Sequence, residues 1–266
     1  MEIDHPRPAY FARIAKNTFK ANAPTRGPWS AEHCHAGPVT GLVVRAFEKA
    51  ISDKMLTRVT LDLLKPVPMD EIRVMAIVHR EGRTVSTATA EVIDSAGRLC
   101  VSARSMHVVH APIDGLKSAP VPRLVRSEAQ RGDSPLPRGK HGLPSFTDFI
   151  QVAFPEGENR DLGPKTIWMK TPPLLASEPP SPFQSICALA DCGNGLSRNA
   201  EFEEMLFMNT DLTIHFHREP RSDWLASSSQ SHWQSSGIGL AQAVISDDQG
   251  PVATALQTLI LRPQPS

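Results

Sequence analysis

The chain contains two similar arrangements of strand-like runs, prolines and turn glycines, and this internal repeat limits the folds that it can adopt. A strand-like run ends at Pro68, and a turn at Gly97 precedes the last strand of that stretch. A second strand-like run ends at Pro220, and a turn at Gly250 precedes another final strand. The two prolines lie 152 residues apart and the two glycines 153 apart. Elements in the same order at nearly equal spacing indicate an internal duplication.

A proline-rich stretch separates the two halves. Of the 24 prolines, 13 fall between Pro112 and Pro182, and the sequence shows little sustained periodicity before about Thr166. Because proline fixes φ and lacks a backbone N–H donor, this composition is typical of a long surface connector. We therefore predict an N-terminal domain over residues 1–110, a connector over 111–165 and a C-terminal domain over 166–266.

Each half is predicted to contain one helix and several antiparallel strands. Residues 37–52 place apolar side chains at helical spacing, and residues 182–190 form the matching helix of the second half. Strands are predicted where β-branched residues are frequent, at residues 72–78, 84–93 and 99–109. A sheet wrapped around one buried helix, present twice, is the hotdog arrangement. We therefore predict an α+β protein of two tandem hotdog domains.

Charge and hydropathy exclude several classes of protein. The 28 Lys and Arg residues balance the 28 Asp and Glu residues, so no overall charge favours nucleic acid or an anionic membrane. No stretch approaches 18 uncharged apolar residues. Met1 to Pro6 contain neither a basic segment nor an apolar run, so we expect no secretion signal. The four cysteines include no Cys-x-x-Cys pair. We expect a cytoplasmic protein with reduced thiols, no nucleic-acid partner and no membrane association.

The sequence lacks the familiar nucleophile and cofactor motifs. It has no Gly-x-Ser-x-Gly motif, and Gly237-Ile238-Gly239 lacks the third glycine of a dinucleotide-binding loop. His33, Cys34 and His35 are metal ligands by type, but adjacent residues converge poorly on one ion and no second Cys/His group follows at ligand spacing. We expect neither a metal nor a cofactor.

Two polar residues interrupt apolar segments of the second half. Asp191 ends the apolar run of the helix at 182–190, directly before a Cys-Gly-Asn-Gly sequence. A partly buried carboxylate there could act as a general base, or it could simply cap the Gly-Asn-Gly turn. Gln257 interrupts an apolar strand, where a buried glutamine needs partners for both its oxygen and its nitrogen. In the register of the two glycine turns, its counterpart in the first half is Arg104.

Asn209 begins a strand in which polar and apolar residues alternate. Strict alternation places it on the polar face, which contains Asn209, Asp211, Thr213, His215 and His217. The other face then contains Leu212, Ile214 and Phe216. Polar residues at five alternate positions are typical of a solvated face, so this pattern does not by itself indicate a site.

Together these segments resemble the double-hotdog acyl-CoA thioesterases. The matching motifs of the first half are His35-Ala36-Gly37-Pro38, Leu64-Lys65-Pro66-Val67-Pro68, Arg80-Glu81-Gly82-Arg83 and Asp94 to Gly97. Those of the second half are Asp191 after an apolar helix, Asn209-Thr210-Asp211-Leu212-Thr213, His217-Arg218-Glu219-Pro220, and Gln257 before the terminal strand. The resemblance covers about residues 30–110 and 165–262, and rests on the order and spacing of the motifs together.

The resemblance implies a reaction and its residues. In the type II thioesterases of this family an Asp, a Thr or Ser, and a Gln hold the attacking water. Asp191 matches the Asp, Gln257 matches the Gln, and Asn209 stands where the threonine is expected. The implied mechanism is direct hydrolysis of an acyl-CoA, with Asp191 as the base and backbone N–H groups at a helix N-terminus polarising the thioester carbonyl.

The resemblance also implies where the substrate lies. The acyl chain would run between sheet and helix, and the phosphates of coenzyme A would meet surface arginines. The candidates are Arg83, Arg218 and Arg221, although arginines of this kind are more often ordinary surface charges. We further expect a homo-oligomer, a dimer or larger.

Two other functions stay open from the sequence. Hotdog folds also include hydratases and dehydratases with a catalytic His–Asp or His–Glu arrangement, for which His215 and His217 are the candidates. Alternatively, the chain binds acyl-CoA without catalysis, with Asn209 in place of threonine as the sign of lost activity.

Overall fold

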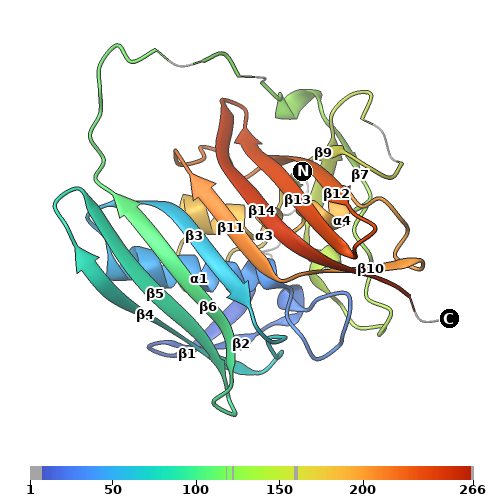
Figure 1. Ribbon diagram of the computed structural model, residues 1–266, viewed down its shortest axis with the longest axis horizontal. Helices are drawn as coiled ribbons and strands as arrows, with labels where there is room; N and C mark the ends of the chain where they lie inside the picture. Colours follow the sequence, from blue (N-terminus) through green and yellow to red (C-terminus); the bar gives the residue numbers. More distant parts are fainter. Residues whose placement is uncertain (1–7, 118, 122, 159–160, 265–266) are drawn as a thin grey trace, which may run out of the picture.

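The computed structural model describes residues 8–117, 119–121, 123–158 and 161–264 (Figure 1). The segment Met1 to Pro6, on which the expectation of no secretion signal rests, lies outside these residues. The strands form a single 14-stranded sheet, and the two longest helices lie behind it in the view of Figure 1. Among the described residues, no helix has the length and apolar character needed to cross a membrane.

The first half contains one long helix and six strands. The helix α1 spans Ala36–Ala50, and a short 3-10 helix, η1, spans Ala23–Thr25. The strands are β1 (Phe11–Ala15), β2 (Thr18–Ala21), β3 (Met55–Leu63), β4 (Glu71–Glu81), β5 (Val85–Asp94) and β6 (Leu99–Val108). They pair antiparallel in the order β1-β2-β4-β5-β6-β3. The helix and the three strands predicted for this half are confirmed.

The second half repeats this plan with additional short elements. Its helices are α2 (Phe146–Phe149), α3 (Pro182–Ala190), α4 (Gly193–Leu196) and the 3-10 helix η2 (Arg126–Glu128). Its strands are β7 (Gln130–Gly132), β8 (Gln151–Phe154), β9 (Lys165–Lys170), β10 (Met205–Asn209), β11 (Asp211–Phe216), β12 (Leu225–Trp233), β13 (Ile238–Asp247) and β14 (Gly250–Pro263). The predicted helix has the observed bounds. Its start is determined locally, because Ser181 caps it and Pro182 occupies its first turn.

The segment predicted as a connector also contributes regular structure. The elements β7, β8 and α2 lie within residues 111–165, and β8 pairs with β9 at the edge of the sheet. Elements of three or four residues are too short to show a period in the sequence, so they were not predicted. The first part of this segment, which follows β6, arches away from the rest of the molecule (Figure 1).

The two halves join through a strand pair and a helix pair. The strand β3 pairs antiparallel with β11, with Thr60 opposite Thr213. Behind the sheet α1 packs on α3 in the opposite direction. His35 at the start of α1 meets Asp191 at the end of α3, and Ser181 at the start of α3 donates a 2.6 Å hydrogen bond to Glu48 near the end of α1. The start of each helix thus contacts the end of the other, which is the pseudo-twofold symmetry expected of a duplicated chain.

The pairing across this axis corrects one correspondence between the halves. Thr60 faces Arg104 in β6, and Thr213 faces Leu256 in β14, so Arg104 corresponds to Leu256. Gln257 therefore corresponds to the buried Ser105 and not to Arg104. The prediction was wrong because the first half has one more residue between its turn glycine and this position.

A buried histidine of the first half predicts a pH-dependent stability. His107 in β6 is fully buried, with Nε2 3.1 Å from Ser105 Oγ, and burial lowers its pKa below 6.5. The unfolded chain takes up a proton that the folded chain resists, so the free energy of unfolding should fall as the pH drops below 6.5. We expect His107→Gln to reduce this dependence in urea unfolding and to leave the share of His217, whose pKa burial also lowers. An equally steep dependence in the variant would contradict this origin.

Candidate active site

The helix α3 delivers Asp191 to the junction of the two halves. Its apolar residues Ile186, Cys187 and Leu189 are buried and fix the position of the helix. Asp191 caps the C-terminal end, and its side chain is only 6% exposed. A carboxylate removed from water to this degree needs hydrogen-bond donors around it.

Two of those donors are the other residues predicted for the site. Asn209 Nδ2 donates to Asp191 Oδ1 at 2.7 Å, and Gln257 Nε2 donates to the same oxygen at 3.2 Å. Gln257 Nε2 also lies 3.2 Å from the Asp191 backbone oxygen, and Gln257 Oε1 accepts from the backbone N–H of Asn194 at 3.3 Å. The two polar ends of the buried glutamine are therefore both bonded, and the three predicted residues lie in one hydrogen-bonded cluster.

Asn209 reaches this cluster because the strand alternation is broken beside it. Asn209 pairs with Leu259 and Thr213 pairs with Leu256, so four steps along one strand match three along β14. This extra residue is a β-bulge, which reverses the face that the preceding residues present. Asn209 consequently points toward the helices, whereas Asp211, Thr213 and His215 face outward. The prediction that Asn209 shares a face with those residues was therefore wrong.

Asp211 stabilises the bulge through a hydrogen bond to β14, and its substitution should disturb the cluster. Its Oδ1 accepts a 2.8 Å hydrogen bond from the backbone N–H of Thr258, next to Gln257. Asp211→Ala should lower stability by about 1 kcal/mol and reduce kcat, because Asn209 and Gln257 would no longer be held in register. Asp211→Asn keeps an acceptor oxygen and should stay close to wild type. Denaturant unfolding and steady-state kinetics of both variants check this. Equal behaviour of the two variants would argue against it.

His35 is a fourth member of the cluster, supplied by the first half. Its Nδ1 lies 2.9 Å from Asp191 Oδ2, and the backbone N–H of Gly37 points at the same nitrogen from 3.2 Å. Its ring stacks on Phe146 of α2, with centroids 4.3 Å apart. The sequence showed His35 as the start of a helix and as part of a rejected metal motif. Nothing local indicated that it meets Asp191, because that contact depends on how the helices pack.

A glycine allows this approach of the two helices. A Cβ atom at Gly37 would lie 2.8 Å from the Cα atom of Ala188 in α3. Only glycine therefore fits at this helix crossing without a shift of the backbone, which explains why the second residue of α1 is a glycine.

The thiols near the cluster are unsuited to nucleophilic attack. Burial raises the pKa of Cys34 to about 12. Burial, and then the charge of Asp191, raise the pKa of Cys192 well above its usual value. Since the thiolate is the reactive form, neither cysteine can serve as the nucleophile near neutral pH.

The structure separates several other candidates from this cluster. His215 and His217 are exposed on the outer side of the sheet. Arg218 is bound to the β13–β14 turn, where it donates to Asp247 Oδ2 at 2.8 Å and to the backbone oxygens of Pro251 and Gly250. Burial alone would raise the pKa of Asp247, but the Arg218 guanidinium and backbone N–H groups lower it to about 2. Arg218 is thus a structural residue, while Arg83 and Arg221 are exposed.

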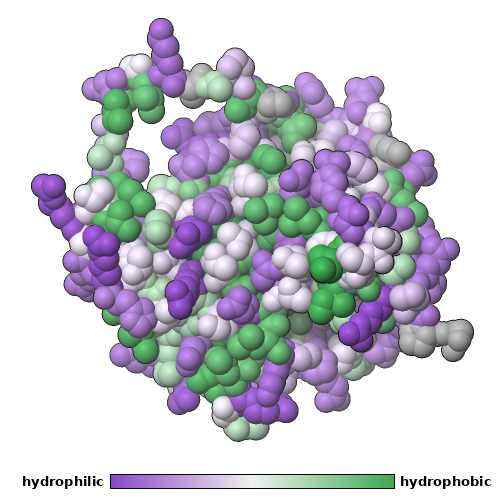
Figure 2. Space-filling model, in the orientation of Figure 1, coloured by the Kyte–Doolittle hydropathy of each residue, from purple (hydrophilic) through white to green (hydrophobic). Residues whose placement is uncertain are grey.

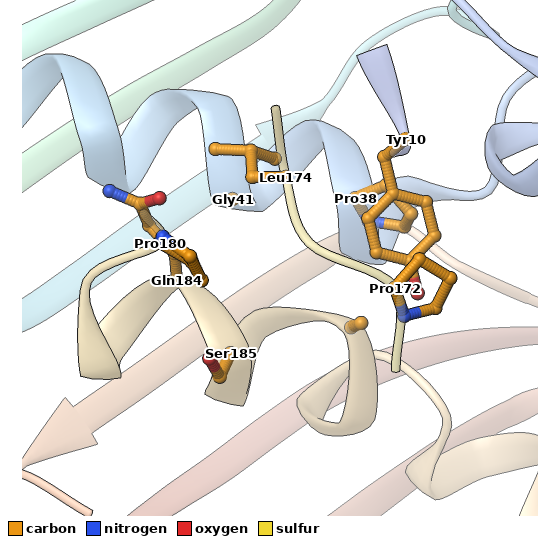
Figure 3. A pocket seen from close by; sticks show the side chains of 9 residues that line it. Tyr10, Pro38, Gly41, Pro172, Leu174, Pro180, Gln184 and Ser185 are labelled. Carbon is orange, nitrogen blue, oxygen red and sulfur yellow. The ribbon is translucent and has the colours of Figure 1, made fainter. Parts of the chain in front are cut away.

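A small cavity lies in the seam between α1 and α3 (Figure 3). Its lining residue Ala188 precedes Asp191 by about one helical turn. Tyr10, Pro38, Gly41, Leu174 and Ala188 are among the residues that line it. Its volume of about 10 Å³ is enough for about one water molecule. The seam is therefore closed by side chains in this conformation.

Comparison with known protein families identifies the kind of site. The profile of the acyl-CoA thioesterase N-terminal domain matches residues 25–108, and that of the C-terminal domain matches residues 125–261. The chain belongs to the acyl-CoA thioesterase family. This confirms the resemblance seen in the sequence, and the family makes the chain a thioester hydrolase. No curated protein matches closely enough to add to this comparison.

Solved structures confirm the double-hotdog fold of this thioesterase-family chain. A candidate thioesterase II from Thermobifida fusca is 14% identical, with a TM-score of 0.73 over 95% of each chain. A hotdog protein of unknown function from Alicyclobacillus acidocaldarius is 14% identical, with a TM-score of 0.71 over 96% of each chain. An acyl-CoA thioesterase II from Mycobacterium marinum is 16% identical, with a TM-score of 0.66 over 96% of each chain. At such identities the likeness concerns the fold alone.

Proposed function

We propose that this thioesterase hydrolyses acyl-CoA by direct attack of a water molecule, with Asp191 as the general base. The observation that carries this proposal is the set of donors around the Asp191 carboxylate. An ionised carboxylate offers about four acceptor positions. Asn209 and Gln257 occupy two on Oδ1, and His35 faces one on Oδ2. Within the described part of the chain no other side chain donates to it, which leaves one position on Oδ2 for water.

The reaction follows from that free position. Water donates one hydrogen bond to Asp191 Oδ2 and attacks the thioester carbonyl carbon as the carboxylate takes its proton. The tetrahedral intermediate then collapses, the C–S bond breaks, and the thiolate of coenzyme A recovers the proton. Water and thioester are thus converted to acid and thiol with no covalent intermediate. A positioned base of this kind contributes about 10²–10⁴-fold to the rate.

The start of α1 supplies candidates for binding the carbonyl oxygen. The N–H groups of Ala36 and Gly37 belong to the first turn, where no intrahelical carbonyl accepts them. The helix dipole adds a partial positive charge at the same end. An oxyanion that forms beside His35 and Asp191 would meet these groups, which is the arrangement that stabilises a tetrahedral intermediate.

In this proposal Asn209 takes the part of the threonine found in related enzymes, since its amide donates to Asp191 as a hydroxyl would. We expect Asn209→Thr to keep kcat within about tenfold of wild type. Asn209→Val has nearly the same shape as the threonine variant but no donor, and should lose about 10–100-fold, equivalent to about 1.4–2.8 kcal/mol of transition-state stabilisation. Steady-state kinetics of the pair check this. Equal rates for Thr and Val would remove Asn209 from the water site.

Release of free coenzyme A from a panel of acyl-CoAs tests the function itself. The panel should grade acyl length from two carbons upward, with protein shown to be folded by circular dichroism. Turnover that peaks at one length supports hydrolysis and defines the acyl preference. Stabilisation by the ligands without thiol release would instead favour a binding role.

The His35–Asp191 contact favours one alternative specifically. Hotdog hydratases use a His–Asp or His–Glu arrangement, and the structure places such a pair at the junction, although not with His215 or His217. Incubation with an enoyl-CoA separates the reactions, because hydration removes the conjugated double bond and releases no thiol. We place hydrolysis first because Asn209 and Gln257 occupy Oδ1 of Asp191 and leave a position on Oδ2 for water.

The seam cavity gives the acyl group a place in this proposal. Its lining residue Ala188 precedes Asp191 by about one turn, and the lining is mainly apolar, but the cavity holds only about one water. Entry of an acyl chain therefore requires the seam to open. Tyr10, whose ring stacks on Phe146 with centroids 6.1 Å apart, is the aromatic residue among those that line the cavity.

The compartment and assembly of the protein are part of the same proposal. All four cysteines are free thiols, which suits the reducing cytoplasm. Exposed apolar residues on β13 and β14, including Leu240, Val244 and Leu256, lie on the outer face of the sheet, and Figure 2 shows apolar groups scattered among polar ones on this side. We propose that this face supports a homo-oligomer, and light scattering after size exclusion measures its mass directly.

A further inference from the structure

We propose that His35 is a positioning residue of this site and carries a proton on Nδ1 that it donates to Asp191 Oδ2. The same proton keeps Nδ1 from accepting the N–H of Gly37, which becomes available to the thioester carbonyl oxygen. One hydrogen atom thereby prepares both the base and the oxyanion donor. This inference rests on the proposed function, because it assigns His35 a part in that hydrolysis.

The geometry around Nδ1 permits only one of two hydrogen bonds at a time. The ring nitrogen has a single in-plane position, which holds either a hydrogen atom or a lone pair. Asp191 Oδ2 at 2.9 Å requires the hydrogen atom, since a carboxylate oxygen can only accept. The Gly37 N–H at 3.2 Å requires the lone pair, since an amide can only donate. The protonation of Nδ1 therefore decides which neighbour is bonded.

Three observations favour the bond to Asp191. The distance to its oxygen is the shorter of the two. A hydrogen bond to a charged group is about twice as strong as one between neutral groups. Asp191 is also a buried carboxylate, at 6% exposure, so the loss of a donor to its Oδ2 would be costly. The carboxylate thus selects the Nδ1–H form of the imidazole.

The ring is held in place for this role by the segment before β8. Phe146 stacks on His35 nearly in parallel, with an angle of 13° between the rings. The backbone N–H of Phe146 donates to the backbone oxygen of Arg26 at 2.8 Å, which ties α2 to the loop that leads into α1. Asp191 comes from the second half, while His35 and Gly37 come from the first. The assembled site therefore depends on the packing of both halves.

Kinetics of two His35 variants test the positioning role. His35→Phe keeps an aromatic ring against Phe146 but removes the donor, and we expect kcat to fall about 10²-fold with KM within threefold. His35→Asn places an amide nitrogen near the position of Nδ1, caps the helix well, and should recover part of the loss. Thermal unfolding of both variants controls for folding. An unchanged kcat in His35→Phe, or no recovery in His35→Asn, would overturn the proposal.

A double variant and a spectroscopic measurement complete the test. If His35 acts through Asp191, then Asp191→Ala with His35→Phe should be no slower than Asp191→Ala alone. Nitrogen NMR of the histidine rings in alkaline buffer should show His35 protonated on Nδ1 in the wild type, and this form should be lost in Asp191→Ala. An Nε2–H form in the wild type would overturn the inference. This readout needs no turnover, so it stands apart from failure of the proposed hydrolysis.

Discussion

Asp191→Ala should reduce kcat for acyl-CoA hydrolysis by about 10²–10⁴-fold, because it removes the carboxylate that accepts the proton of water in the proposed mechanism. The loss should appear mainly in kcat, since in the proposed mechanism Asp191 acts on the attacking water and not on the bound substrate. The measurement is coenzyme A release at saturating substrate. Activity at the wild-type level in a folded Asp191→Ala protein would rule out this carboxylate as the base.

Asp191→Asn is the matched control for that experiment. The amide has the shape of the carboxylate but cannot take a proton from water, so a comparable loss is expected. The NH₂ group of the new asparagine would also face an N–H donor of Asn209, Gln257 or His35. This contact between two donors should lower the stability as well. Urea unfolding of both variants separates this cost from the loss of the base. A large loss in Ala with full activity in Asn would mean that Asp191 acts by shape and not by charge.

Gly37→Ala should impair both stability and catalysis. Its Cβ would lie 2.8 Å from Ala188 Cα and 3.0 Å from the Ala188 backbone oxygen, so α1 and α3 must separate. Overpacking of this kind costs about 1–3 kcal/mol, of which the better helix propensity of alanine returns at most about 1 kcal/mol. Separation of the helices also lengthens the contact between His35 and Asp191, and we expect kcat to fall at least tenfold.

Gly41 provides the comparison, one turn further along the same helix. A Cβ there would meet the Leu174 Cδ1 atom at 3.0 Å, and a flexible side-chain end can move aside. Gly41→Ala should therefore keep its stability and its kcat, and any effect of the methyl group, which narrows the seam cavity, should appear in KM. Denaturant unfolding and kinetics of the two glycine variants measure the difference. Equal losses of stability and of kcat in the two variants would show that the close approach of the helices at Gly37 imposes no particular constraint.

Local signals account for the parts of the fold that the sequence predicted. The helix at Pro182–Ala190 has its own cap and a proline in its first turn, so its bounds follow from a few adjacent residues. The hairpin at Gly97 has a glycine with φ of 79°, a backbone conformation that glycine adopts freely. The strands β7 and β8 carry no comparable signal, because four residues form a strand only when a neighbour such as β9 is in place.

The residues of the candidate site also fall into those that the sequence predicted and those whose position depends on tertiary packing. Asp191 and Gln257 were predicted because polar residues interrupt apolar segments and match a known family. The inward direction of Asn209 depends on a bulge, which one extra residue creates only in the context of the partner strand β14. His35 could not be assigned, because its contact with Asp191 joins the start of one helix to the end of another across the two halves.

A single turnover in water enriched in oxygen-18, with enzyme in excess over acyl-CoA, tests direct hydrolysis most closely. Attack by water held at Asp191 places the label in the product acid during this first turnover and leaves the Asp191 peptide unlabelled. Mass spectrometry of the acid and of a digest of the enzyme reads both. Unlabelled acid together with oxygen-18 in the Asp191 peptide would show that the carboxylate attacks the thioester itself, and would contradict its role as the base.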